Sequence, residues 1–324
     1  MTELHEPARR TPVAADVDLC VVGGSATGAF AAIRAARMGL SVAIVEKHGF
    51  FGGTATAGLV SVWHSLFDTT GARRIIGGLT QETIDRLDRR GAVHLDDPAN
   101  PNLYAIFNSV ELAMELDQLI VDNDVRIFLH ARFVAAYGED GRCETVVIED
   151  ASGRRAIRAR AFVDATGSAR LVREMGLPAR RNDPLQPPTT CGLFGGLEAL
   201  GRALPDFNLT RAVFDESNPH HLPPGFLWSA GIPGLDDMTM VAGTRVHGTD
   251  GADADSLTRA EIEGRRQLRC IADTVREASK YAGVDVGLAA TASHIGLRET
   301  RHAECLYTLT ERDVLTGRDF DDTV

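Results

Sequence analysis

One stretch near the start of the chain constrains the fold more than any other. It is DLCVVGGSATGAFAAIRAARMGLSVAIVEK, from Asp18 to Lys47. We expect a buried strand from Leu19 to Val22 and a helix from about Thr27 to Met38, which Gly39 ends. A second apolar strand, Val42 to Val45, follows. Two parallel strands joined by one helix form a βαβ unit of the kind that binds a dinucleotide.

The turn between the first strand and the helix predicts where a nucleotide lies. The N–H groups at a helix N-terminus lack helical acceptors, and the helix dipole favours an anion there. Glu46 follows Gly28 by 18 residues, close to the roughly 20 expected for a carboxylate that accepts hydrogen bonds from a ribose. We therefore predict a pyrophosphate on the turn and a ribose on Glu46.

One residue departs from the G-x-G-x-x-G pattern of such units. Gly23 and Gly28 hold the outer glycine positions, but the middle position is Ser25. Its side chain partly fills the space through which backbone approaches the pyrophosphate, and a positive φ there would cost about 1–2 kcal/mol. Its hydroxyl could instead bond a phosphate oxygen, which is the alternative we favour.

Composition limits the class of partner. The chain has 324 residues, of which 44% are apolar and 24% charged, enough for a large core and for two domains. The net charge of −11 and a pI of about 5.4 argue against nucleic acid or an anionic membrane as a partner.

Neither targeting nor cysteine patterns point outside the cytoplasm. The first 16 residues contain no apolar run, and no later segment approaches the roughly 18 apolar residues of a membrane helix. The five cysteines are far apart and form no C-x-x-C pair. That spacing is typical of reduced cytoplasmic thiols and gives no iron–sulfur or zinc signature.

Downstream periodicity predicts the rest of a doubly wound α/β domain. The expected elements are helices at about 80–90 (with Thr80 as N-cap) and 109–122, a strand at 125–129, an inserted β-meander at about 131–160 and a strand from Phe162 to Ala165. Glycine and proline at 176–178 and 183–190 indicate a domain boundary. We therefore expect a flexible tail over 1–15, a nucleotide-binding domain over 16–182 and a second, α+β domain over 183–324.

The second domain and the histidines give weaker signals. We expect a strand at 238–246, a long helix at about 256–282 and further strands near 287–297 and 305–309. His64 is interpreted as a core histidine, and His220 and His221 as a solvated loop rather than metal ligands. Arg298 and Arg301 could receive an anionic substrate, although a salt-bridged surface is the favoured interpretation.

Three features together resemble the FAD-dependent oxidoreductases of the glutathione-reductase-like class. They are VVGGSATG with Glu46, the loop GFFGGTATAG, and DATGSA after the meander. Within that class the chain is similar to the family labelled FAD-dependent oxidoreductase. The likeness extends to GLVSVWHSL, IIGGLTQETIDRL and HIGLRETRHAECLYTLTERDVLTG. These motifs are specific to flavin binding and do not identify a substrate.

The resemblance implies a role for each matching residue. The FAD pyrophosphate would lie on Gly23, Gly24, Ser25, Thr27 and Gly28. Glu46 would bind the adenosine ribose, and Lys47 would lie along the adenosine. The phosphates and the flavin-side linker would lie beside Gly52, Gly53, Thr54 and Ala55. The backbone of Val134 would contact adenine, and the strand end that closes over the cofactor would be Ala165, Thr166 and Gly167. Ser168 stands where the family often has aspartate.

The resemblance also implies a late glycine-rich turn with an acidic residue that completes the flavin site. No such turn follows Thr310 in this sequence. We therefore expect the chain as given to take up little FAD and to gain little thermal stability from it. A homo-oligomer or a partner that completes the site is the alternative.

The leading interpretation is an enzyme that moves a hydride or electrons between a small-molecule substrate and FAD. A flavin-dependent monooxygenase or halogenase is the runner-up, because it shares the first motif. A truncated, non-catalytic nucleotide-binding subunit is a third possibility. An NAD-binding dehydrogenase is also compatible with Glu46, but the GFFGGTATAG loop favours FAD.

Overall fold

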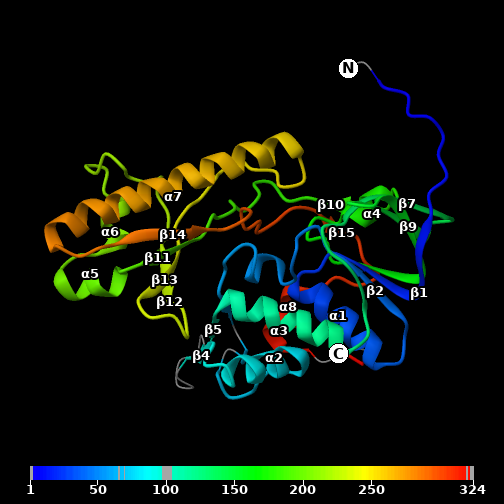
Figure 1. The fold of residues 1–324 in the computed structure, drawn as a ribbon, viewed down its shortest axis with the longest axis horizontal. Helices are drawn as coiled ribbons and strands as arrows, with labels where there is room; N and C mark the ends of the chain where they lie inside the picture. Colours follow the sequence, from blue (N-terminus) through cyan, green and yellow to red (C-terminus); the bar gives the residue numbers. More distant parts are fainter. Residues whose placement is uncertain (1–2, 65, 69, 97–103, 319, 322–324) are drawn as a thin grey trace. The chain divides into compact units, whose positions relative to one another are not determined.

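The chain divides into two compact units. The computed structural model describes residues 3–64, 66–68, 70–96, 104–318 and 320–321 (Figure 1). Unit 1 comprises Met1–Phe51 and Leu119–Pro178, and unit 2 comprises Gly52–Gln118 and Ala179–Val324. This division differs from the sequence-based one, because residues 52–118 cluster with the second unit although they precede much of the first in the chain.

Unit 1 is built on a six-stranded sheet of the Rossmann type. In sheet order its strands are β6 (Arg126–Phe128), β2 (Val42–Val45), β1 (Val13–Val22), β9 (Gly153–Asp164), β8 (Arg142–Asp150) and β7 (Arg132–Glu139). The first four are parallel, and β8 and β7 are antiparallel additions. Leu19 pairs with Val42 and Val22 with Val45, which confirms the predicted parallel pair. The helix α1 (Ala26–Arg37) joins β1 to β2 and packs on both.

The meander extends the parallel sheet instead of interrupting it. The predicted boundary near residue 160, between the meander and a separate strand from Phe162 to Ala165, is wrong. The last meander strand and residues Phe162 to Asp164 form one strand, β9, of 12 residues, and Ala165 follows it directly. Ile157 of β9 pairs with Val146 on one side and with Ala15 on the other, so one strand serves as the last of the meander and as a parallel neighbour of β1. β1 begins at Val13, within the segment predicted as a tail.

One face of this sheet carries a continuous apolar core. Alternate residues of β1 and β2 contribute to it, as expected for strands whose side chains alternate between faces. Its fully buried members include Cys20, Val22, Ala43, Val146, Ile148 and Ile157. The short helix α4 (Arg170–Glu174) adds Leu171 to the same cluster. Cys20 is therefore a core residue of this sheet.

Unit 2 contains a four-stranded antiparallel sheet that one long helix covers. The sheet order is β12 (Trp228–Gly231), β13 (Met238–Ala242), β11 (Gly192–Gly195) and β14 (Gly287–Thr291). The helix α7 (Ala254–Ala282) runs along this sheet in Figure 1 and packs Leu268, Ile271 and Val275 against Phe194 and Val241. The opposite face presents Leu193, Trp228 and Met240, against which Leu59 and Val60 pack.

The remaining elements of unit 2 are short. They are η1 (Gly53–Ala55), the sheet β3 (Val62–Trp63), β5 (Ala105–Phe107), β4 (Val93–Leu95), the pair β10 (Ala179–Arg180) and β15 (His302–Ala303), and the helices α2 (Gly78–Asp88), α5 (Leu197–Ala203), α6 (Leu209–Phe214) and α8 (Glu311–Thr316). The helix α3 (Ser109–Asp122) runs from unit 2 into unit 1.

Three local predictions in unit 2 are wrong. Helix α2 has Gly77 as its N-cap, and Thr80 already lies in the first turn. Residues 305–309 form no strand, because Leu306, Tyr307 and Leu309 are exposed and the neighbouring strand is β15 instead. The predicted core residue His64 is exposed. The last two predictions fail because these side chains are exposed to solvent and no neighbouring element that the structure describes covers them.

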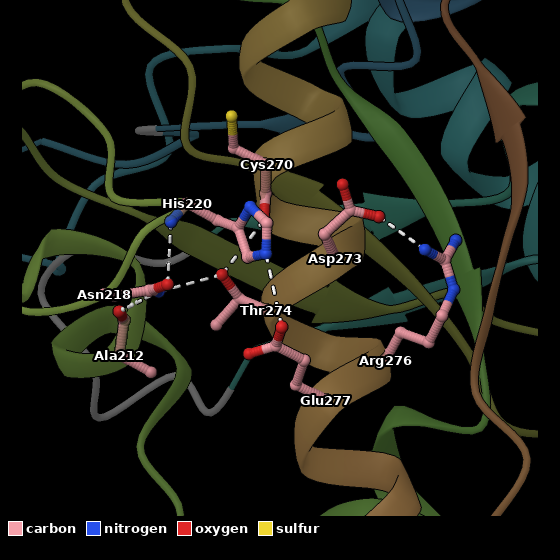
Figure 2. A network of polar contacts seen from close by, with 8 residues as sticks. All are labelled: Ala212, Asn218, His220, Cys270, Asp273, Thr274, Arg276 and Glu277. Atoms are coloured by element: carbon pink, nitrogen blue, oxygen red, sulfur yellow. Dashed lines mark hydrogen bonds and ion pairs between the residues drawn. The ribbon is translucent and has the colours of Figure 1, made fainter.

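A polar network attaches the loop after α6 to helix α7. Figure 2 shows Asn218 and His220 directed toward this helix. The Asn218 side-chain amide donates to the Ala212 carbonyl at 2.8 Å and to the Thr274 hydroxyl at 3.0 Å. His220 Nε2 lies 3.3 Å from a Glu277 carboxylate oxygen. In the described ranges, no group of three or more His, Cys, Asp or Glu side chains is arranged to hold a metal ion.

None of the helices that the structure describes combines the length and apolar character needed to cross a membrane. Even α7, with 29 residues, carries charged side chains throughout.

Burial predicts a clear order of thiol reactivity. Cys20 and Cys191 are fully buried, and burial raises the pKa of each thiol to about 12, so neither supplies thiolate at neutral pH. Cys305 is exposed. We expect a thiol-specific reagent to modify Cys305 first in the native protein, and Cys20 and Cys191 only on unfolding. Loss of the fast phase in Cys305→Ser is the control; a fast phase that survives this change contradicts the assignment.

Candidate functional site

The glycine turn after β1 is shaped by close backbone contacts. Gly23 has a φ of 108°, and a Cβ there would lie 2.3 Å from the Ala165 carbonyl oxygen. A Cβ at Gly28 would lie 1.9 Å from the Gly23 carbonyl oxygen. Both positions therefore require glycine, the first for its conformation and the last for the close approach of α1 to the turn.

Ser25 takes part in this turn without strain. Its φ and ψ are −60° and 172°, an extended conformation that any residue adopts. The positive φ considered for it is absent. Ser25 is the N-cap of α1, and its hydroxyl oxygen accepts a hydrogen bond from the Gly28 N–H at 3.3 Å. Capping uses a lone pair, so the hydroxyl proton can still be donated to another acceptor.

Glu46 lies at the carboxyl end of β2 and is only 5% exposed. One carboxylate oxygen accepts from the Gly24 N–H at 2.7 Å and the other accepts from the His48 N–H at 2.8 Å. A Cβ at Gly24 would lie 2.8 Å from the Glu46 Cβ. The backbone bonds allow this charge to be buried, and they leave further lone pairs on both oxygens.

A third strand end meets the same turn. The Ala165 N–H donates to the Val22 carbonyl at 2.8 Å, directly before Gly23. Asp164 shapes the segment that follows: it accepts from the Thr166 N–H at 3.1 Å, from the Thr166 hydroxyl at 2.6 Å and from the Val172 N–H at 3.1 Å. Gly167 then adopts a φ of 73°. Asp164 is the first residue of the DATGSA motif, but the sequence pattern does not indicate this structural role.

The other predicted residues of unit 1 lie at different places on the sheet. Val134 lies in β7, where the register against β8 shifts between Phe133 and Ala135. Val134 is therefore the bulged residue, and its backbone has no opposite partner in the ladder. Lys47 is exposed directly after Glu46.

The predicted flavin-side loop belongs to unit 2. Gly52 and Gly53 have φ values of 107° and 56°, and Gly53, Thr54 and Ala55 form the 3₁₀ turn η1. The Ser109 hydroxyl donates to the Ala55 carbonyl at 2.7 Å and so fixes the end of this turn. The structure thus brings the residues from Gly23 to Gly28, Glu46 and Ala165 to Gly167 together within unit 1, and it describes residues 52–55 separately, with unit 2.

An aromatic cluster in unit 2 escaped the sequence analysis. The ring centroids of His64 and Tyr104 lie 5.8 Å apart, those of His64 and Trp228 6.1 Å, and those of Tyr104 and Trp228 6.5 Å. His64 is exposed and the other two rings are half-buried. Because the three residues are far apart in the chain, no local pattern could have predicted that they meet.

Comparison with known families decides the family of this protein. Residues 18–324 match the family described as FAD dependent oxidoreductase. The chain belongs to this family. Membership makes it an enzyme of the flavin oxidoreductase type, with FAD as its cofactor. No curated protein matches the sequence.

Solved structures share the fold at low sequence identity. The p-nitrophenol 4-monooxygenase PnpA from Pseudomonas putida DLL-E4 is 12% identical, with a TM-score of 0.56 over 89% of this chain and 70% of that one. The myxobacterial chondrochloren halogenase CndH is 16% identical, with a TM-score of 0.51 over 88% and 64%. A glycerol-3-phosphate dehydrogenase from Bacillus halodurans, complexed with FAD, is 15% identical, with a TM-score of 0.51 over 89% and 57%. This chain therefore spans less than two thirds of the length of the last two proteins.

The residues of unit 1 fit the adenosine diphosphate part of FAD. The glycine turn leaves no room for a Cβ at Gly23 or Gly28, and it directs the N-terminus of α1 outward from the carboxyl end of β1. Glu46 is a fixed acceptor beside that turn. In open α/β sheets, ligands bind outside the carboxyl ends of the strands, and the ends of β1, β2 and β9 meet at this place.

Replacement of Glu46 tests this arrangement. Glu46→Ala removes the acceptor for two backbone N–H groups, each such bond to a charged group contributing about 1.5–3 kcal/mol. We expect a lower free energy of unfolding in the absence of FAD and an FAD affinity weakened by about tenfold or more. Denaturant unfolding and FAD titration measure the two effects.

The exposed Glu144 of β8 provides the matched control for Glu46. Glu144→Ala should change neither quantity. Wild-type FAD affinity in a folded Glu46→Ala protein would show that the carboxylate only braces the turn.

Proposed function

We propose that this FAD-dependent oxidoreductase binds its cofactor through the strand ends of unit 1. Gly23, Gly24, Ser25, Thr27 and Gly28 hold the pyrophosphate, with Ser25 donating its hydroxyl proton to a phosphate oxygen. Glu46 accepts from the ribose hydroxyls, and Lys47 lies along the adenosine. The observation that carries the proposal is the buried Glu46 carboxylate bonded to the Gly24 N–H.

Two further parts of unit 1 complete the adenosine side. The unpaired backbone of Val134 at the β7 bulge contacts adenine. Ala165, Thr166 and Gly167, held by Asp164, cover the cofactor at the end of β9. In unit 2, residues Gly52, Gly53, Thr54 and Ala55 lie along the phosphates and the flavin-side linker.

The bound FAD supplies hydride or electron transfer, and the chain supplies binding and orientation. The substrate is a small molecule that unit 2 receives. Support comes from the cluster of His64, Tyr104 and Trp228, whose rings meet edge to face and whose Trp228 packs with Leu59 and Val60. The proposed compartment is the cytoplasm.

A monooxygenase or halogenase reaction is the second candidate. The shared fold with PnpA and CndH favours it, although identities of 12% and 16% carry only the fold. Oxygen distinguishes the two reactions. With reduced nicotinamide as electron source, a monooxygenase consumes oxygen in step with product, whereas the simple oxidoreductase turns over anaerobically with an artificial acceptor.

Ser25→Gly tests the cofactor assignment at one atom. Because Ser25 is unstrained and glycine is an acceptable N-cap, the free energy of unfolding without FAD should change by only a few tenths of a kcal/mol. Loss of the phosphate bond should weaken FAD binding by about 0.5–1.5 kcal/mol.

The matched control is Ser152→Gly, in the exposed turn between β8 and β9. FAD binding by Ser25→Gly at least as tight as in the wild type would exclude the phosphate bond. A loss well beyond tenfold would show that the serine does more than cap the helix and bond one oxygen.

A further inference from the structure

A half-buried arginine in unit 2 is held in place by neutral groups. Arg245 follows β13, and its Nη1 donates to the Thr244 carbonyl at 2.7 Å and to the Thr189 hydroxyl at 3.2 Å. Gln267 of α7 fixes the main chain of the same residue, accepting from its N–H at 2.7 Å and donating to its carbonyl at 2.9 Å. A guanidinium has five N–H donors, so most of its donors remain available for a ligand.

A second arginine lies on the segment beside it. Thr189 and Gly296 exchange two backbone hydrogen bonds, of 3.1 and 2.8 Å, and Arg298 follows Gly296 by two residues. The pKa of Arg245 is lowered by burial and then by the positive charge of Arg298. Within the described ranges, no carboxylate forms an ion pair with either arginine.

The carboxylates around this arginine pair already have other partners. Glu261 accepts from the Ile295 N–H at 2.7 Å and pairs with Arg265. Glu263 pairs with Arg266. Glu299, next to Arg298 in the chain, accepts from the Gln186 N–H and pairs with His302. Two like charges, one of them half-buried, therefore lack a counter-charge, which an anion would supply.

The segment that leads to Arg298 contacts the loop predicted to run along the flavin-side linker. A Cβ built on Gly296 would lie 3.7 Å from the Thr54 Cγ2. Both the N–H and the hydroxyl of Ser293 donate to the Ala57 carbonyl, at 2.9 and 3.1 Å. The segment that carries Arg298 is thus fastened to the loop after η1, and all of these residues belong to unit 2.

We propose that Arg245 and Arg298 bind an oxyanion, a carboxylate or phosphate group, carried by the substrate. The proposal rests on the function proposed above, in which unit 2 receives the substrate. Arg245 is the preorganised, half-buried partner, since Thr189, Thr244 and Gln267 hold it before the ligand arrives. Arg298 is exposed and supplies the second positive charge to the oxyanion.

Inorganic phosphate and acetate are the probes, titrated at constant ionic strength into the protein without FAD while thermal unfolding is followed. We expect both anions to raise the Tm of the wild type. Arg298→Gln, at an exposed position, should fold normally and bind each anion about tenfold more weakly. Its Tm without anion should be equal to or above that of the wild type at low salt, because a like charge has been removed.

Two further variants sharpen the result. Arg245→Lys keeps the charge but not the planar fork, and should also weaken anion binding. Arg269→Gln removes an exposed arginine of α7 and should leave it unchanged. Equal anion affinity in wild type and Arg298→Gln overturns the proposal, as does equal weakening by Arg269→Gln.

FAD titration of Arg298→Gln separates the two sources of an oxyanion. Unchanged FAD affinity assigns the site to the substrate, as proposed. A parallel loss of FAD affinity assigns it to a cofactor phosphate and overturns the substrate assignment. The anion titration is done without FAD. Its result therefore remains interpretable even if the proposed FAD site is wrong.

Discussion

The buried carboxylate of Glu46 ties the end of β2 to the glycine turn after β1. A buried charge is tolerable only when hydrogen bonds replace its hydration, and the N–H groups of Gly24 and His48 do so. The conformation of this turn depends on backbone contacts that leave no room for a side chain at Gly23 or Gly28. One arrangement therefore fixes the helix start, the strand end and a buried acceptor beside the turn.

The local part of this arrangement could be predicted from the sequence. The strand from Leu19 to Val22, the turn and the strand from Val42 to Val45 are each set by neighbours within a few residues, and the register confirms them. Ser25 shows where the local prediction stops. The G-x-G-x-x-G pattern identifies serine at this position as a departure, but it does not predict that the serine caps α1. An unstrained serine cap satisfies one helix N–H, which glycine at that position could not do with a side chain.

Features that depend on distant pairing could not be predicted in this way. β9 is one strand because it has a neighbour on each side, and Val134 bulges because of its register against β8. The exposure of His64 and the absence of a strand at 305–309 also depend on distant parts of the chain. The local sequence does not show whether another element covers these side chains. Arg245 carried no sequence signal, because its significance lies in Thr189 and Arg298 beside it.

Recognition of the adenosine diphosphate part of FAD by unit 1 can be measured by competition against FAD binding. The competitors are ADP, which carries the adenosine side of the cofactor, and FMN, which carries the flavin side. We expect ADP to displace FAD, and FMN at the same concentration to leave FAD bound. Displacement by FMN without displacement by ADP would contradict the assignment of the glycine turn and Glu46.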